Sequence, residues 1–312
     1  MNKVISFFLL IIVLFSFVGS QEKQDEKTTL CITFDDGSTK DFVNYKNEVW
    51  NKMILQHLEN HNLKSILYVA GKNLDSPEGK AILETWDSAG HLIANHTYGH
   101  LNYNSSKMTF EKYEKSILRC DSLINSYEHY VKFFRAPYLK RGETVAKRDS
   151  LINFLKNINY KNGYVTIDAS DWFVNTKLIK FMKANPGESI EGYKKCYIAH
   201  LMERAKFYDD LAYELTGRRI KHSLLLHHNL TSALFLGDLI AEFKKEGWNF
   251  INAKETLTDE IYNHQHAIIP AGESIVWSIA KESEKYDDIL RYPAEDSKYE
   301  EENMNKLVLC QQ

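Results

Sequence analysis

Seven short apolar runs alternate with helical segments along this chain, and that alternation constrains the fold more than any other feature. The runs occupy residues 30–34, 65–71, 92–94, 131–134, 163–167, 223–226 and 248–251. The segments predicted to be helical are 42–60, 80–88, 110–127, 144–157, 193–215 and 233–245. A strand followed by a helix, repeated in this way, folds into a parallel sheet with helices outside it. Seven such units favour an α/β fold in the form of a closed or nearly closed barrel.

The chain is predicted to form a single domain over residues 28–256, because no internal repeat or low-complexity linker divides it. Its 312 residues, 44% of them apolar, are enough for a sizeable core. Residues 257–312 form an extension rich in Glu, Asp, Lys and Tyr, with one patterned stretch at 275–280. We expect this extension to pack on the barrel or to trail from it, fraying after Tyr299.

The first twenty residues differ from the rest of the chain. Lys3 is their only charged side chain, residues 4–18 are predominantly apolar, and small residues precede Gln21. This pattern is typical of a signal peptide over residues 1–20. The apolar run is short for a membrane span, which needs about 20 residues. We therefore expect export to the periplasm, cell envelope or exterior, with no stable membrane insertion after cleavage.

Composition limits the classes of partner. A formal net charge of −3 provides no basic field, which argues against nucleic acid or an anionic membrane surface. An aromatic content of 12% can supply side chains that stack on sugar rings. The four cysteines are too few and too widely spaced for a disulfide scaffold or a thiolate metal site, and the sequence does not decide whether they pair: Cys31, Cys120, Cys196 and Cys310.

Polar residues follow five of the predicted strands directly. They are Asp35 and Asp36, residues 95–100, residues 135–138, Asp168 with Asp171 and Trp172, and residues 227–229. Asp-Asp-Gly alone is good turn chemistry. In a parallel barrel, however, the carboxyl ends of the strands meet at one face, so these five sets converge. The coincidence predicts an active site there.

Two of these sets together make a metal site. His96 and His100 are four residues apart, a spacing that one turn of helix brings to the same side. With Asp36 they supply two imidazoles and one carboxylate, and they leave positions open for water and substrate. This donor set predicts one divalent ion. Zinc is the first candidate, and cobalt or nickel would also accept these ligands.

Such an ion lowers the pKa of bound water toward about 7 and polarises a carbonyl, which suits hydrolysis of an amide or ester. Asp35 is the predicted base, with Arg135 keeping its carboxylate ionised. His227 is the predicted acid for the leaving amine, charged and oriented by Asp171. The backbone amide of Tyr138 is expected to hold the oxyanion.

The remaining histidines have weaker patterns. His228 stands beside His227, so the acid carries a one-residue ambiguity, which the register of residues 224–227 resolves in favour of His227. His264 and His266 lie in the extension and are expected to be solvated.

Five ordered motifs resemble one known family. They are Thr33-Phe34-Asp35-Asp36-Gly37, His96-Thr97-x-x-His100, Arg135-x-Pro137-Tyr138, Asp168-x-x-Asp171-Trp172 and Leu225-x-His227. Over residues 29–256 the chain resembles the NodB-like polysaccharide deacetylases, carbohydrate esterase family 4. The resemblance implies a deformed (β/α)7-type barrel, the NodB homology domain, that removes N-acetyl or O-acetyl groups from glycans with one divalent metal ion.

The resemblance also carries over residue by residue. It implies the base, ligand and acid roles given above, with Trp172 as a wall of the substrate groove and Leu225 as lining of the acetyl pocket. Two departures from the family pattern leave the identity of the glycan undecided. Residues 38–40 stand where many relatives carry a proline, and the segment 172–222 is long.

The leading hypothesis is an exported metal-dependent hydrolase that removes N-acetyl groups from peptidoglycan, a chitin-like glycan or another polysaccharide. One alternative keeps the metal site and changes the substrate to an O-acetyl ester or a small amide. Another is a non-catalytic glycan-binding protein, which would need neither Asp35 nor His227. The sequence does not set the oligomeric state.

Overall fold

The computed structural model describes residues 27–309, so the predicted signal peptide lies outside the described range. Seven strands form one sheet in the order β5-β4-β3-β2-β1-β6, with β7 also paired to β1. Every pairing is parallel. The strands are β1 (Thr29–Asp36), β2 (Ile66–Val69), β3 (Leu92–Asn95), β4 (Tyr130–Phe134), β5 (Lys161–Asn162), β6 (Lys221–His227) and β7 (Asn249–Phe250).

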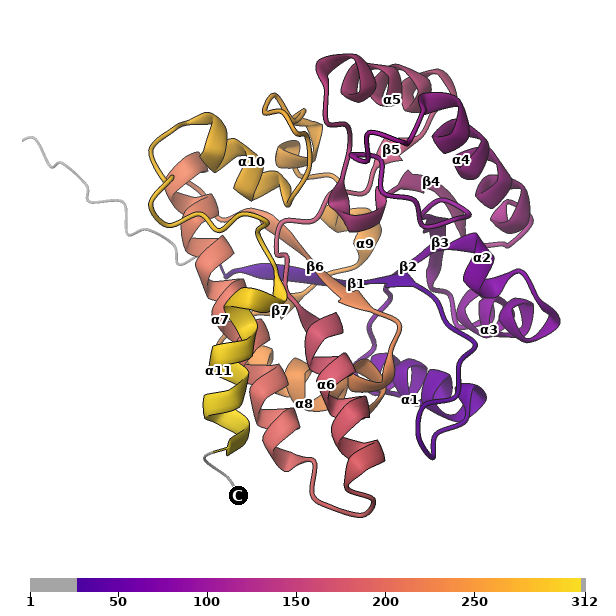
Figure 1. Ribbon diagram of the computed structural model, residues 1–312, viewed down its shortest axis with the longest axis vertical. Helices are drawn as coiled ribbons and strands as arrows, with labels where there is room; N and C mark the ends of the chain where they lie inside the picture. The colour runs from indigo at the N-terminus through magenta and orange to yellow at the C-terminus, as the bar shows by residue number, and fades with distance from the viewer. Residues whose placement is uncertain (1–26, 310–312) are drawn as a thin grey trace, which may run out of the picture.

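The helices surround this sheet (Figure 1). They are α1 (Asn47–Asn60), α2 (Gly71–Leu74), α3 (Pro77–Ser88), α4 (Phe110–Ile124), α5 (Val145–Asn157), α6 (Asp171–Ala184), α7 (Glu191–Thr216), α8 (Leu230–Lys245) and α9 (Ala253–Thr256), with short 3-10 turns at Pro137–Leu139 and Glu260–Asn263. The parallel α/β barrel predicted from the alternating pattern is confirmed. The long segment 172–222 contains α6 and α7, of which only α7 has a sequence pattern that predicted it.

Side-chain caps explain where several helices begin. Ser76, Thr109, Thr144 and Asn229 each accept a hydrogen bond from the backbone N–H three residues later. Such a cap satisfies one of the amide groups that a helix leaves free at its first turn. The Asn229 cap begins α8 directly after β6, so the chain turns sharply at the point where His227 ends the strand.

An irregular segment brings the two ends of the sheet together. The sequence predicts a strand over residues 163–167, and this position is wrong, because β5 ends at Asn162 and only Ile167 bridges Leu224 of β6. The N–H groups of Thr166 and Ile167 both donate to the Ser223 carbonyl at 3.1 Å. The sequence pattern of an apolar, β-branched segment does not distinguish a hydrogen-bonded strand from a buried segment that pairs with no strand. The barrel is therefore deformed at this place.

The extension packs against the barrel. Its helices α10 (Ile275–Glu282) and α11 (Ser297–Leu309) both contact α7, and Figure 1 shows α11 lying alongside it. Ile275 and Val276 of α10 are fully buried, and α11 continues as a helix past Tyr299.

Two further findings concern membranes and thiols. Among the helices of residues 27–309, none is both long enough and apolar enough to cross a bilayer. Cys31, Cys120 and Cys196 are unpaired and buried, and burial raises the pKa of the Cys31 and Cys120 thiols to about 12. These thiols are therefore inert apolar groups of the core.

Candidate active site

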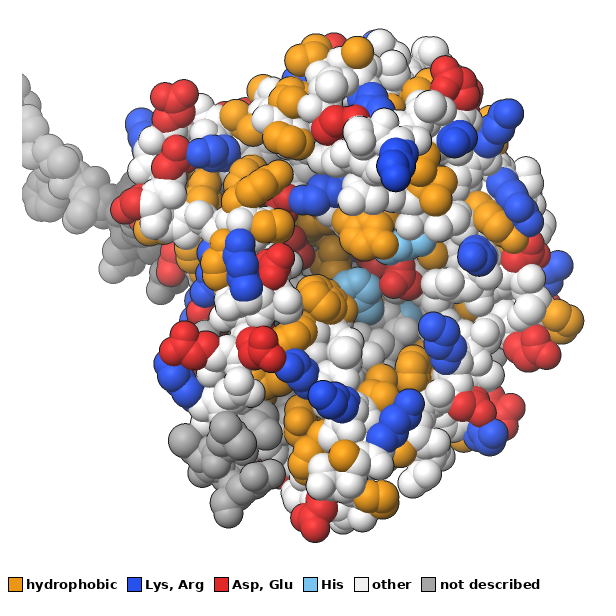
Figure 2. All heavy atoms as spheres, viewed as in Figure 1, with side chains coloured by type: hydrophobic (Ala, Val, Ile, Leu, Met, Phe, Trp, Pro, Cys, Tyr) orange, Lys and Arg blue, Asp and Glu red, His pale blue; other side chains and the backbone are white. Residues whose placement is uncertain are grey.

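A cavity of about 500 Å³ lies at the carboxyl ends of the strands. Figure 2 shows it as a hollow in which histidine and acidic side chains meet apolar ones. It is lined by the predicted residues Asp35, Asp36, His96, His100, Tyr138, Trp172, Leu225 and His227. The two remaining predicted residues, Arg135 and Asp171, are buried behind Asp35 and His227 and hold them by ion pairs.

The three predicted metal ligands lie together. The ligand atoms of Asp36, His96 and His100 are all within 4.8 Å of one another. Oδ1 of Asp36 lies 3.1 Å from Nε2 of His100 and 3.7 Å from Nε2 of His96. That oxygen is buried and forms a hydrogen bond with no residue in the described part of the chain. An acceptor that faces two imidazole nitrogens without a hydrogen bond fits a shared cation.

Protonation states also suit a metal. Burial lowers the pKa of His96 to about 4, so its imidazole is neutral at pH 7. Its Nδ1 lies 2.8 Å from the Arg135 carbonyl oxygen, which places the proton on Nδ1 and leaves the lone pair on Nε2. Burial acts to raise the pKa of Asp36, but nearby His100 and His227 lower it below its usual range. The residues therefore fit a divalent cation.

His96 and His100 lie close together, but the reason predicted for this proximity is wrong. Both residues lie in a loop after β3, not on a helix. Thr97 and His100 have left-handed backbones, with φ of 63° and 49°. The Thr97 N–H donates to Oδ1 of Asn95 at 2.9 Å, which stabilises this loop. The two imidazoles meet because the loop is tightly turned.

Asp35 is held by a buried arginine. Nη1 of Arg135 lies 2.6 Å from Oδ1 of Asp35 and 2.8 Å from the Thr33 hydroxyl. The Arg135 guanidinium also donates to the Gly163 carbonyl and lies 3.9 Å above the Tyr68 ring. Since Oδ1 of Asp35 is occupied, Oδ2 is the oxygen that faces the predicted metal ligands, 3.6 Å from Nε2 of His96.

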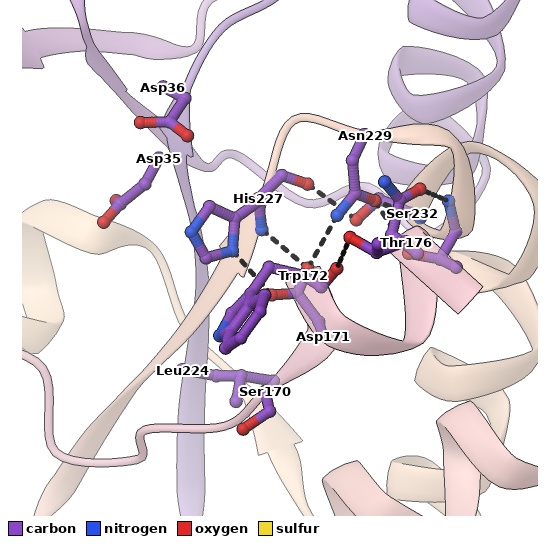
Figure 3. Close-up of polar contacts among 12 residues, drawn as sticks. Asp35, Asp36, Ser170, Asp171, Trp172, Thr176, Leu224, His227, Asn229 and Ser232 are labelled. Carbon is purple, nitrogen blue, oxygen red and sulfur yellow. Dashed lines mark hydrogen bonds and ion pairs between the residues drawn. The ribbon is translucent and has the colours of Figure 1, made fainter. Parts of the chain in front are cut away.

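His227 is held by Asp171 (Figure 3). Its Nδ1 lies 2.6 Å from Oδ1 of Asp171, and its backbone N–H donates to Oδ2 at 2.8 Å. Burial acts to lower the pKa of His227, but the Asp171 carboxylate outweighs it and raises the pKa to about 10. The ring is therefore an imidazolium at neutral pH, and its other nitrogen faces the side on which Asp35 and Asp36 lie.

His228 has a different environment. Its Nδ1 accepts the Ser38 N–H at 3.1 Å, and its Nε2 lies 2.9 Å from Oδ1 of Asn51. The ring packs on Trp50, and burial lowers its pKa to about 3. The geometry therefore favours His227, not His228, as a proton donor to the cavity. In the extension, His266 is buried, so the expectation that it is solvated is wrong.

Aromatic side chains border the cavity on the solvent side. Trp172, 39% exposed, follows Asp171 in the first turn of α6. Tyr138, 57% exposed, has a left-handed backbone with φ of 56°, and its ring packs on His100. Leu225 forms a small buried cluster with Leu139 and Val165. Exposed aromatics above an apolar floor suit the face of a sugar ring and a methyl group.

The extension also lines the cavity, which the sequence did not indicate. Glu273, Pro293 and Glu295 come from residues 257–312, and Lys140 and Asp168 lie on the same cavity wall of the barrel. Of these, only Asp168 had a sequence signal, because it directly follows a predicted strand.

Two comparisons with known sequences each match less than half of the chain. Residues 22–156 match the family model described as polysaccharide deacetylase. Over 147 residues the chain is 28% identical to a peptidoglycan-N-acetylglucosamine deacetylase of Bacillus cereus, and the match covers 47% of each protein. The chain thus spans about half the length of that relative. Asp171 and His227 lie beyond the residues that match the family model.

Solved structures share the fold over about three quarters of the chain. A mutant of a CE4 family pseudoenzyme with restored enzymatic activity has a TM-score of 0.52 at 18% identity, covering 74% of this chain and 68% of that one. A peptidoglycan N-acetylglucosamine deacetylase has a TM-score of 0.51 at 20% identity, and the match covers 74% of this chain and 88% of that one. The chitin deacetylase of Colletotrichum lindemuthianum has a TM-score of 0.51 at 17% identity, and the match covers 78% of this chain and 95% of that one.

These likenesses confirm the deformed barrel. In this chain, carboxylates and imidazoles gather at the carboxyl ends of the strands of that barrel. The resemblance to polysaccharide deacetylases is confirmed by the family model over residues 22–156, a range that contains the first three of the five motifs.

Proposed function

We propose that this protein is a metal-dependent deacetylase that removes N-acetyl groups from an N-acetylglucosamine-containing glycan. One observation carries the proposal. Asp35 and His227 are register partners on the adjacent strands β1 and β6, and both line the cavity that contains Asp36, His96 and His100. A base, an acid and a metal donor set in one cavity are what amide hydrolysis requires.

Asp36, His96 and His100 would hold one divalent ion, with zinc as the first candidate and cobalt or nickel as others. The bound ion supplies a water of lowered pKa and polarises the acetyl carbonyl.

The protein's own groups then move the protons. Oδ2 of Asp35 takes a proton from the attacking water, while Arg135 occupies Oδ1 and keeps the carboxylate aligned. The water oxygen bonds to the carbonyl carbon, and the backbone amide of Tyr138 stabilises the negative carbonyl oxygen. When the C–N bond breaks, the imidazolium of His227 donates its proton to the leaving nitrogen. Acetate and a free amine result.

The substrate follows from the cavity walls and from the relatives. Trp172 and Tyr138 offer exposed rings for sugars, and Leu225 offers an apolar contact for the acetyl methyl group. The Bacillus cereus relative is named for peptidoglycan N-acetylglucosamine. Such glycans lie outside the cytoplasm, so we also propose that residues 1–20 direct export and that residues 28–256 form the catalytic domain.

The test is acetate release from chitin oligomers, peptidoglycan fragments and acetylated xylan, measured by an enzyme-coupled acetate assay. Zinc-loaded protein should release acetate from an N-acetylated glycan, and chelation should stop it. Asp35→Asn should reduce the rate by about 10²-fold or more, since it removes the base. Asp238→Asn, a change of the same kind on the surface of α8, is the control and should keep the rate.

Two results would contradict the proposal. Unchanged acetate release by Asp35→Asn would remove the mechanism. Release from acetylated xylan without release from any N-acetylated glycan would indicate an O-acetyl esterase with the same site.

A further inference from the structure

The extension builds one end of the cavity. The Ala271 N–H donates to the Gly142 carbonyl at 2.8 Å, and the Ile275 N–H donates to the Val165 carbonyl at 2.9 Å. These two bonds hold residues 271–275 against the barrel rim. Glu273 lies between them with a left-handed backbone, φ of 63°, which is unfavourable for a residue with a side chain. The fold therefore fixes the Glu273 side chain at the cavity wall.

Three carboxyl groups line this end of the cavity: Asp168, Glu273 and Glu295. Two of them have a cationic partner. Glu273 forms an ion pair with Lys140, and Oε1 of Glu295 lies 2.8 Å from both Nε and Nη2 of Arg204. The third, Asp168, forms no ion pair with any cation of the described residues.

Asp168 is the carboxyl without a partner. It is 8% exposed, and it makes no hydrogen bond or ion pair with any residue in the range 27–309. Burial, and then the charge of Glu273, raise its pKa to about 7. Beside it, Oε2 of Glu295 is a buried oxygen without a hydrogen-bond partner in the described structure. A buried carboxyl oxygen without a donor is costly, so it calls for a ligand or another explanation.

We propose that Asp168, with Glu273 and Glu295 beside it, binds the ammonium group of a glucosamine unit. This unit is next to the N-acetylated sugar whose acetyl group is removed. A primary ammonium carries one positive charge and three hydrogen-bond donors. It would therefore supply the hydrogen-bond donors that Asp168 and Oε2 of Glu295 do not have as partners. An N-acetylated neighbour offers no such charge, and a neighbour bearing a carboxylate is repelled. This inference rests on the proposed function, and it names the preferred substrate as a partly deacetylated chain of N-acetylglucosamine.

The experiment measures binding, not turnover. The probes are the glucosamine tetramer and the N-acetylglucosamine tetramer, titrated by calorimetry into zinc-loaded Asp35→Asn protein, in which hydrolysis is blocked. We expect the glucosamine tetramer to bind at least tenfold more tightly. In Asp35→Asn/Asp168→Asn protein this ratio should fall at least fivefold. Asp288→Asn, an exposed aspartate of the extension outside the cavity, should keep the ratio.

A ratio near one in the Asp35→Asn protein, or a ratio unchanged by Asp168→Asn, would overturn the proposal. Glu273→Gln is the second variant if Asp168→Asn unfolds, and it should lower the ratio in the same direction. Metal-free wild-type and Asp168→Asn proteins, titrated in parallel, should differ in this ratio in the same direction. A failure of the proposed function can be distinguished from a failure of this inference, because it appears in the acetate assay as release that does not depend on Asp35.

Discussion

One carboxylate, that of Asp171, binds both the ring and the backbone of His227. Oδ1 lies 2.6 Å from Nδ1 of the ring, and Oδ2 accepts the His227 N–H at 2.8 Å. Oδ2 also accepts from Nδ2 of Asn229 at 3.1 Å, and Asp171 is fully buried. The position of the imidazole and its positive charge thus have the same source.

Asp171→Asn should therefore change the pH profile as well as the rate. The raised pKa of His227, about 10, keeps the imidazolium protonated as the pH rises, so activity that depends on this proton is lost only on the alkaline side. Without the carboxylate, the alkaline limb of kcat/KM should move to lower pH, and kcat should fall by about 10²-fold or more. Steady-state rates from pH 6 to 10 measure both. An alkaline limb that stays in place would exclude His227 as the acid.

Metal binding should stabilise the folded protein. A ligand that binds only the native state at 100 times its Kd adds about 2.7 kcal/mol. Zinc should therefore raise the Tm, and chelation should lower it. His100→Ala should abolish most of this shift because it removes one of three ligands. His61→Ala, which removes an imidazole outside the cavity, is the control, and an equal loss of the shift there would refute the assignment.

Arg135→Met should destabilise the barrel. It leaves the Asp35 carboxylate buried without its cation, and breaking a buried pair on one side costs about 3–5 kcal/mol. Urea unfolding measures the free energy of unfolding. The double variant Asp35→Asn/Arg135→Met should lose less than the sum of the single changes, because it leaves no buried carboxylate. Additive losses would show that the two side chains are not coupled.

Glu300→Ala should destabilise the protein more than the adjacent change Glu301→Ala. Oε2 of Glu300 lies 2.9 Å from Nδ1 of buried His200, whose Nε2 accepts the Ser170 N–H at 2.9 Å. Removing Glu300 leaves these groups unsatisfied, at about 1–3 kcal/mol. Glu301 forms a surface ion pair with Lys177, worth at most about 1 kcal/mol. Thermal and urea unfolding of the two variants decide between them, and equal losses would contradict the prediction.

Much of the site was predictable because a parallel sheet delivers its strand ends to one face. The residues at the carboxyl ends of β1 and β6 and the residue directly after β3 meet in the cavity for that reason. The conformation of the loop between His96 and His100 was not predictable. Spacing favours a helical turn there, whereas the loop depends on left-handed residues and on a hydrogen bond that the Thr97 N–H donates to Asn95.

The wall formed by the extension could not be predicted for a different reason. Glu273 and Glu295 carry no local pattern, and their place depends on backbone bonds to Gly142 and Val165, more than a hundred residues away. The strand prediction over residues 163–167 is wrong for a similar reason, because the neighbours of a buried apolar segment decide whether it pairs as a strand. Long-range packing, which single-sequence patterns do not encode, determined both.

The sheet order also affects how the chain can be made. β1 lies between β2 and β6, and the Thr33 hydroxyl donates to the Leu224 carbonyl across 191 residues of sequence. During synthesis one edge of β1 therefore stays unpaired until β6 has left the ribosome, and such an edge invites pairing with other chains. A fragment limited to residues 22–156 would carry the three proposed metal ligands and Asp35, yet it would expose this edge permanently. The smallest unit that can be produced in folded form must extend at least through β6.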